Sequence, residues 1–147
     1  EALDREGLAR EEPDDVAEIA RGERTELRVG NLDARRDWGW APDYVDAIWR
    51  ILQYPVPDDF VVGTGEMHTA RELVAIAFAH AGLDPADYVK FDPAFVRALD
   101  LQALCAGSIK TRRELGWQAT KPFGEIIREM VDVELHANSP SQLAGVS

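Results

Sequence analysis

Residues 30–44, with the sequence GNLDARRDWGWAPDY, constrain the fold more than any other stretch of this chain. The stretch follows an alternating run that ends at Val29 and is typical of a β-strand. It begins with a glycine, which favours a turn, and it ends beside Pro42, whose fixed φ suits the first turn of a helix. The sequence therefore predicts a strand, a loop with paired arginines and tryptophans, and a helix in close succession.

Hydrophobic periodicity predicts helices on both sides of this loop. The helix after Pro42 is expected to bury one apolar face, made of Tyr44, Val45, Ile48, Trp49 and Leu52. Thr69 and Glu72 form a capping box that opens a further helix ended by Gly82. A helix is expected after residue 122 as well, with inward positions at Phe123, Ile126, Ile127 and Met130.

Shorter elements complete this α/β pattern. Apolar runs predict strands at 26–29, 60–62 and 88–91, and Pro13 is expected to interrupt any helix that precedes a short one near Val16. Ser108 is expected to cap a small helix ended by Gly116, after which Trp117 anchors the chain. We expect residues 1–15 to be an acidic, disordered lead-in, 16–136 to form one α/β domain, and 137–147 to be a disordered tail.

The charge of the chain excludes several classes of partner. The formal net charge is -11 at pH 7, which disfavours binding to nucleic acid or to an anionic membrane surface. No stretch approaches the roughly 20 apolar residues of a membrane span, and the N-terminus shows no signal-peptide pattern. We therefore expect a cytoplasmic protein that has neither nucleic acid nor membrane as a partner.

Residues able to carry chemistry are sparse. Cys105 lies in an apolar run and is expected to be buried in a reducing compartment. The histidines are scattered without ligand spacing, so no metal site is predicted, and no nucleophile can be matched with a base. The sequence Gly63-Thr64-Gly65-Glu66 suggests a phosphate loop, but it lacks a third glycine and is more simply a turn.

Two sets of polar residues are candidates for ligand binding. Arg35 and Arg36 stand together in an acidic chain, and a guanidinium fork matches phosphate oxygens two at a time. A solvated surface pair is the alternative. Arg97 and Asp100 stand three apart, where they can meet a phosphate and sugar hydroxyls, although an ion pair within one helix explains the spacing equally well.

Four segments together resemble the C-terminal half of the GDP-mannose 4,6-dehydratase family. They are residues 30–39, the helix through Tyr44, Val45 and Trp49, residues 59–66, and residues 114–117 with 128–131. The likeness extends from about residue 16 to residue 135 with few gaps. By this resemblance the fold is the substrate-binding portion of an extended short-chain dehydrogenase, mostly helices with a few short strands, from which the Rossmann half is absent.

The resemblance implies a lyase that uses bound NADP to oxidise C4 of GDP-mannose, eliminate water across C5 and C6, and return the hydride to C6. It also implies that Arg36 grips the substrate diphosphate and that Arg97 and Asp100 hold the phosphate and ribose of the nucleotide. Trp40, Ala98 and Asp100 depart from the family pattern of histidine, proline and glutamate. The residues that bind NADP and catalyse the reaction belong to the half that this sequence lacks, so no catalytic residue is assigned.

We therefore expect a truncated, GDP-sugar-binding protein that is inactive alone, and the sequence leaves open whether it acts as an enzyme. The alternatives are a non-catalytic nucleotide-sugar-binding or assembly module and a decayed gene product. GDP-mannose is the expected ligand. A separate Rossmann-bearing chain, or a second copy of this chain, is the expected protein partner, because the helix after Pro42 would otherwise expose its apolar face.

Overall fold

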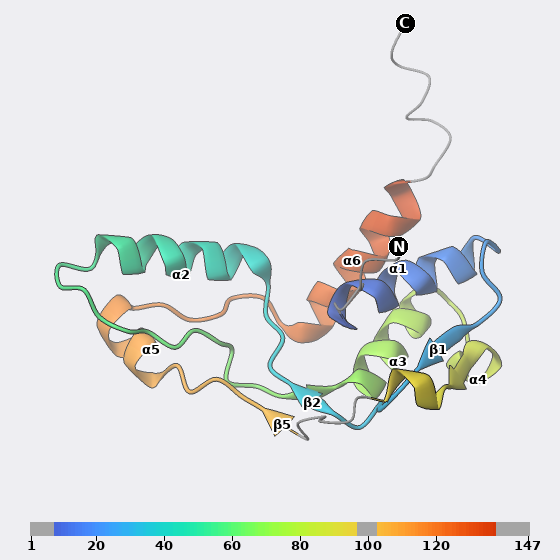
Figure 1. The fold of residues 1–147 in the computed structure, drawn as a ribbon. Helices are drawn as coiled ribbons and strands as arrows, with labels where there is room; N and C mark the ends of the chain where they lie inside the picture. The colour runs from blue at the N-terminus through green and yellow to red at the C-terminus, as the bar shows by residue number, and fades with distance from the viewer. Residues whose placement is uncertain (1–7, 97–102, 138–147) are drawn as a thin grey trace, which may run out of the picture.

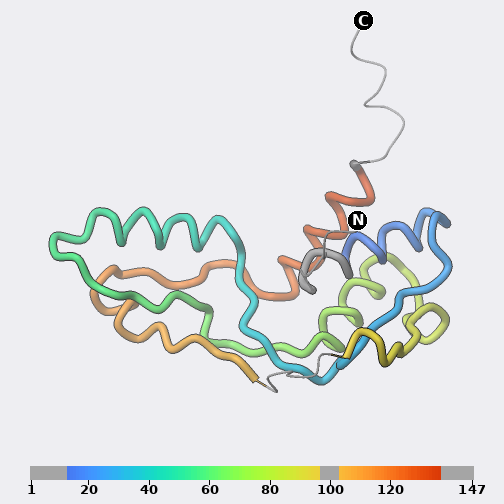
Figure 2. The backbone as a smooth tube through the Cα atoms, viewed as in Figure 1, coloured from blue at the N-terminus to red at the C-terminus, as the bar shows by residue number. Residues whose placement is uncertain are grey.

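The computed structural model describes residues 8–96 and 103–137 of the chain, whose path is shown in Figures 1 and 2. The helices are α1 (Leu8–Ala20), α2 (Ala41–Gln53), α3 (Ala70–His80), α4 (Pro85–Tyr88), α5 (Ile109–Leu115), α6 (Phe123–Ala137) and the 3-10 turn η1 (Pro93–Phe95). The strands are β1 (Leu27–Val29), β2 (Arg35–Arg36), β3 (His68–Thr69), β4 (Val89–Phe91) and β5 (Ala103–Leu104). Helices thus dominate the described part, as expected.

The hydrophobic core lies where α1, α3 and α6 pack together against β1 (Figure 1). Each helix contributes its apolar face, and the largest side chain fully enclosed there is Phe78 of α3. The other buried members of this cluster are Val16, Ile19, Leu27, Val29, Leu73, Val74, Ala77, Phe123, Ile127 and Val131. Burial of this apolar surface is the main stabilising contribution to this part of the chain.

The strands form two small sheets. β1 and β4 pair in parallel, with Leu27 opposite Val89. β2 is the central strand of the other sheet, where it lies antiparallel to β3 and parallel to β5. The two residues of β2 are Arg35 and Arg36, so the paired arginines lie at the centre of this sheet.

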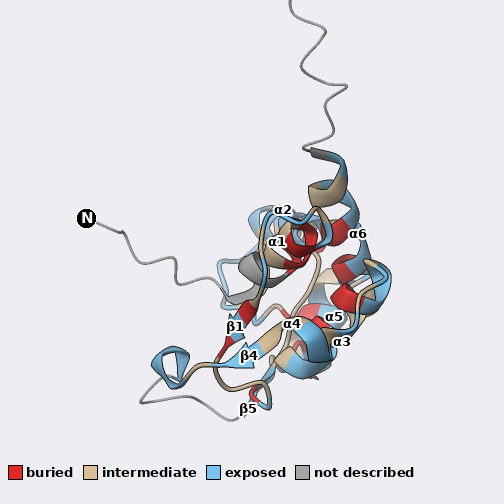
Figure 3. Cartoon of the chain, turned by 90° about the vertical axis from the view of Figure 1, so that its right-hand side faces the viewer, coloured by how far each residue is buried: buried red, intermediate tan, exposed pale blue. Residues whose placement is uncertain are grey.

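Helices α2 and α5 pack on each other and project away from the core, to the left in Figures 1 and 2. Figure 3 shows that buried residues concentrate in α1, α3, α6 and β1. Residues 37–40, 54–67 and 105–108 connect the projecting helices to the sheet, and residues 116–122 connect α5 to α6. Among the described residues, we find no helix that is both long and apolar enough to cross a membrane.

Several expected elements are confirmed. β1, β4 and α5 form where the sequence indicates, and the capping box of α3 is complete, since Thr69 and Glu72 exchange side-chain and backbone hydrogen bonds. Gly116 ends α5 with a left-handed φ of 61°, which a residue without Cβ adopts at little cost. The inward positions of α6 are buried at Phe123, Ile126 and Ile127.

The N-terminal boundary differs from the expectation. α1 begins at Leu8 and continues through Pro13, so the proline does not interrupt it. Proline removes a single N–H donor from a helix, and the ring of Pro13 is fully buried, which offsets that loss. Most of the expected C-terminal tail lies outside the described residues, and Ala137 is the last residue of α6.

Residues 60–62 do not form a strand, contrary to the expectation. The carbonyl groups of this region accept hydrogen bonds from side chains of α5 and its cap instead. Thr111 Oγ1 donates to the Val61 carbonyl at 2.6 Å, and Ser108 Oγ donates to the Gly63 carbonyl at 2.8 Å. Ser108 therefore precedes α5 as expected, but its hydroxyl binds a neighbouring segment and does not cap the helix.

Candidate functional site

Arg36 lies on the central strand β2, between two other strands. In the sheet it is opposite His68 of β3 and Leu104 of β5. The residue is half-buried, and its Nη1 donates to the Arg35 carbonyl at 2.9 Å. Because alternate side chains of a strand point to opposite faces, Arg35 and Arg36 serve different sides of the sheet. The two arginines are thus not equivalent, although they are adjacent in sequence.

The other two predicted site residues, Arg97 and Asp100, lie outside the described residues. The structure therefore does not test whether they meet Arg36. β5 begins at Ala103, the first described residue after that gap, and Ala103 pairs with Arg35. The chain thus returns to the side of β2 soon after these two positions.

Asp37, directly after Arg36, is the polar centre of this region. Its Oδ1 accepts hydrogen bonds from the Thr64 amide at 2.9 Å and from Thr64 Oγ1 at 2.6 Å. Its Oδ2 accepts the amides of Gly65 at 3.0 Å and Ala106 at 3.2 Å. One carboxylate therefore joins β2, the loop after residue 62, and the residues that follow β5.

The hydrogen bonds to Asp37 outweigh the effect of its burial. Burial raises the pKa of the Asp37 carboxyl, but the Thr64 hydroxyl and the amides of Gly65, Thr64 and Ala106 favour the charged form. The pKa therefore lies below the ordinary value of an aspartate. The same bonds favour a turn over a phosphate loop at residues 63–66, because the amides of Thr64 and Gly65 bind a side chain of this protein.

Asp43 makes a second junction at the start of α2. Its Oδ2 accepts the Thr120 amide and its Oδ1 accepts the Thr120 hydroxyl, each at 2.8 Å. The Asp43 carbonyl accepts Trp117 Nε1 at 2.7 Å, and Trp117 is only 2% exposed, which confirms its predicted role as an anchor. Asp43 thus ties α2 to the connection that leads into α6.

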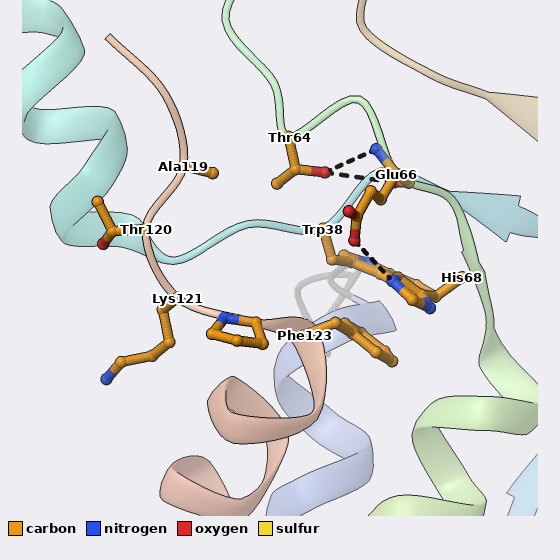
Figure 4. Close-up of a pocket in the computed structure, with 9 residues that line it drawn as sticks. Trp38, Thr64, Glu66, His68, Ala119, Thr120, Lys121 and Phe123 are labelled. Carbon is orange, nitrogen blue, oxygen red and sulfur yellow. Dashed lines mark hydrogen bonds and ion pairs between the residues drawn. The ribbon is translucent and has the colours of Figure 1, made fainter.

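A small cavity lies between the loop after residue 62 and the start of α6 (Figure 4). On one side the Phe123 ring stacks on His68, with centroids 4.1 Å apart, and on Trp38, with centroids 5.6 Å apart. Thr64 and Glu66 also line the cavity, whose volume is about 170 Å³. Pockets for small molecules usually measure about 300–1,000 Å³, so this cavity cannot enclose a nucleotide sugar by itself.

The apolar face of α2 is exposed, as expected for this helix without a partner, although its periodicity alone is typical of a buried face. Val45, Ile48, Trp49 and Leu52 are between 56% and 74% exposed. The period of the face is as expected, but among the described residues the helix packs mainly on α5. We call these four residues the α2 apolar face.

The structure also places Cys105 and Trp40. Cys105 is exposed and not buried as expected, because it follows the short edge strand β5 rather than lying in the core. Lys121 Nζ lies 3.8 Å from the centroid of the Trp40 ring. Within the described residues, no group of three or more histidine, cysteine or acidic side chains could hold a metal ion.

Asp37 and Asp43 are the residues that the sequence did not reveal. The hydrogen-bond partners of Asp37 lie 27 to 69 positions away in sequence, and Thr120 lies 77 positions from Asp43. The available signals were two aspartates inside an unusual stretch and a Gly-Thr-Gly sequence later in the chain. Nothing local links them, so the pairing emerges from the fold.

Comparison with known proteins identifies the family. The model of the family described as "GDP-mannose 4,6 dehydratase" matches residues 3–130. GDP-mannose 4,6 dehydratase 2 of Arabidopsis thaliana is 40% identical over 120 residues, which cover 82% of this chain and 32% of the relative. The human GDP-mannose 4,6 dehydratase is 37% identical over 145 residues, which cover 86% of this chain and 39% of the relative.

Solved structures show the same fold. The RMD protein of Pseudomonas aeruginosa, solved with NADPH, has a TM-score of 0.80 at 17% identity and covers 92% of this chain and 44% of its own. An epimerase-like protein of Burkholderia cenocepacia has a TM-score of 0.74 at 29% identity and covers 89% and 43%. This chain therefore spans about a third to two fifths of the length of its curated relatives. It belongs to the GDP-mannose 4,6-dehydratase family.

Proposed function

We propose that this chain is the GDP-sugar-binding portion of a GDP-mannose 4,6-dehydratase, with Arg36, Arg97 and Asp100 as substrate-binding residues. The complete protein would convert GDP-mannose to GDP-4-dehydro-6-deoxy-mannose and water. Family membership supports this proposal, as does the span of about a third to two fifths of the relatives' length. The observation that carries it is the position of Arg36 on the central strand β2.

Arg36 suits a diphosphate for physical reasons. A guanidinium group offers paired N–H donors that match two phosphate oxygens, and such charge-assisted bonds are about twice as strong as neutral ones. The strand fixes the backbone of Arg36 on both sides.

The Gly-Thr-Gly loop at residues 63–65 does not fit a dinucleotide site. Dinucleotide sites direct free backbone amides at the pyrophosphate, whereas the amides of Thr64 and Gly65 are bound to Asp37. We propose that NADP and the catalytic groups belong to a cofactor-binding half outside this sequence. On this basis the chain alone binds the substrate and does not convert it.

The α2 apolar face supports a protein partner. Contiguous exposed apolar surface on a helix marks an interaction site more often than solvent-facing structure. We propose that the cofactor-binding half covers this face, and that copies of this chain associate through it when that half is missing. The alternative, a non-catalytic assembly module, would use the same face. A decayed gene product would show neither ligand binding nor defined association.

Calorimetry with GDP-mannose tests the ligand. We expect measurable binding by the purified chain and about tenfold to a hundredfold weaker binding by Arg36→Ala, because charge-assisted bonds to phosphate are lost. Arg35→Ala is the matched control, since it removes the same side chain from the other side of the strand. An absence of heat at millimolar ligand, or equal losses in both variants, would contradict a site at Arg36.

Sedimentation tests the surface. We expect self-association of the chain alone, which Val45→Glu abolishes by placing a charge in the α2 apolar face. Val133→Glu on α6 is the control, because Val133 is 58% exposed and Val45 is 65% exposed, but Val133 lies outside that face. Turnover of GDP-mannose with NADP by this chain alone would refute the need for a second half. A monomer at all concentrations would refute the association.

A further inference from the structure

We propose that Asp37 is a positioning residue for Arg36. Its carboxylate holds the strand that carries the arginine against the two segments that flank it. The inference rests on the proposed function, because it treats Arg36 as the group that binds the ligand diphosphate. Asp37 itself does not touch the ligand in this proposal. It acts through the backbone that it fixes.

Three segments that are remote in sequence converge on this carboxylate. The Asp37 amide donates to the Leu104 carbonyl at 3.1 Å and so continues the pairing of β2 with β5 by one residue. The side chain of the same residue binds the Ala106 amide beyond β5 and the Thr64 amide and hydroxyl. Asp37 therefore holds its own strand, the neighbouring strand and the loop together within one residue of Arg36.

The chemistry of the contacts requires a carboxylate. The four donors to Asp37 described above are three backbone amides and one hydroxyl, and all of them are neutral. A ring of N–H groups of this kind stabilises a negative charge. An asparagine at this position would direct its own N–H groups at one set of these donors, so an isosteric neutral side chain cannot satisfy both sides.

Gly63 and Gly65 of the loop both lie against the Asp37 carboxylate. A Cβ at Gly63 would lie 2.9 Å from Asp37 Oδ2 and would collide with Ala106. Gly65 has a φ of 83°, a conformation that side chains disfavour, and its amide reaches Asp37 Oδ2. The Gly-Thr-Gly sequence therefore forms a cradle for an internal carboxylate next to Arg36. The sequence resembles a phosphate loop because in both cases backbone amides bind a negatively charged group.

Alanine at position 37 tests this assignment, with GDP as the probe. We expect Asp37→Ala to bind GDP about tenfold more weakly than the unchanged chain, because the side-chain contacts that help to hold the backbone beside Arg36 are lost. Asp43→Asn is the matched control, since it weakens another buried carboxylate junction that lies on the α2 side. We expect its GDP affinity to stay within about twofold of the unchanged chain.

Chemical rescue separates positioning from loss of structure. Sodium formate supplies the missing carboxylate, so it should restore GDP binding by Asp37→Ala. Sodium chloride at the same ionic strength is the control and should not restore binding. Formate should give no gain with Asp43→Asn. Unchanged GDP affinity in Asp37→Ala, or no rescue by formate, would overturn the assignment. If Asp37→Ala does not fold, Asp37→Asn replaces it, and retention of full affinity there would overturn the assignment as well.

Amide hydrogen exchange keeps this inference separate from the proposed function. If the unchanged chain fails to bind GDP, the proposed function fails, but the role of Asp37 is still measurable. The Arg36 and Asp37 amides should then exchange at least about tenfold faster in Asp37→Ala, while amides in α3 and α6 stay protected. Formate should restore the slow exchange. Equal exchange at Arg36 and Asp37 in both proteins would overturn the inference.

Discussion

Replacing Asp43 with alanine removes the carboxylate that joins the first turn of α2 to the connection before α6. Asp43 is 7% exposed, and both of its carboxylate oxygens accept hydrogen bonds from Thr120 at 2.8 Å. The bond from Trp117 Nε1 to the Asp43 carbonyl is unaffected, because it uses the backbone. The change therefore removes two hydrogen bonds and leaves the neighbouring anchor in place.

The size of the effect follows from these two bonds. A hydrogen bond to a charged group contributes about 1.5–3 kcal/mol to stability, and two bonds between the same residues are not fully additive. Thr120 is exposed, so water can take the place of the lost acceptor, which favours the lower end of the range. We expect the free energy of unfolding to fall by about 2–3 kcal/mol, a large share of the roughly 5–15 kcal/mol of an ordinary domain.

Urea unfolding followed by circular dichroism measures this loss. The Thr120→Val variant completes a double-mutant cycle, because it removes the hydroxyl and keeps the backbone amide. In the Asp43→Ala background, Thr120→Val should cost less than about 0.5 kcal/mol, because the partner of the hydroxyl is already gone. A loss below about 0.5 kcal/mol in Asp43→Ala, or full additivity of the two changes, would refute the role assigned to this junction.

Three further changes probe the same loop and the core. The pKa of Asp37 is lower in the folded chain than in the unfolded chain. Its charge therefore contributes fully to stability above the unfolded pKa of about 3.9, and this contribution is lost as the pH falls through the folded pKa. The difference in urea midpoint between the unchanged chain and Asp37→Asn should shrink on acidification from pH 6 to pH 3. Gly63→Ala should destabilise the chain by about 1–3 kcal/mol in urea unfolding, since its Cβ collides with Ala106. Thr69→Ala should lower the free energy of unfolding by about 1 kcal/mol, seen as a lower thermal midpoint, because it breaks the capping box of α3. For each of the three changes, an unchanged measurement would contradict the contact that it probes.

The helices could be predicted because their signals are local. The capping box of α3 needs residues three positions apart, and the inward face of α6 repeats within single turns. Periodicity also placed α2 correctly. It could not say what covers the apolar face of α2, since a pattern identifies a surface and not its partner. The expectation of an exposed face comes from the resemblance instead, because the resemblance implies that a partner covers this helix, and the 56% to 74% exposure agrees with it.

The site was predictable only in part. The residue types single out the pair Arg35 and Arg36, and the resemblance to the family selects Arg36. The fold adds that Arg36 lies on a central strand. The sequence read residues 60–62 as a strand because they are apolar, whereas side chains of α5 and Ser108 bind the carbonyl groups there and at Gly63. Asp37 and Asp43 carry no local signal, because their partners are brought to them by the fold.

The two aspartates also explain why α2 stays away from the core. Asp37 fixes the start of the connection at β2 and β5, and Asp43 fixes the first turn of α2 to the segment before α6. A helix free to move would gain about 2 kcal/mol for each large apolar side chain that it buried on the core. Hydrogen bonds to both carboxylates oppose that collapse. The hydrogen bonds of the two aspartates therefore hold the exposed α2 apolar face in the position that the proposed docking needs.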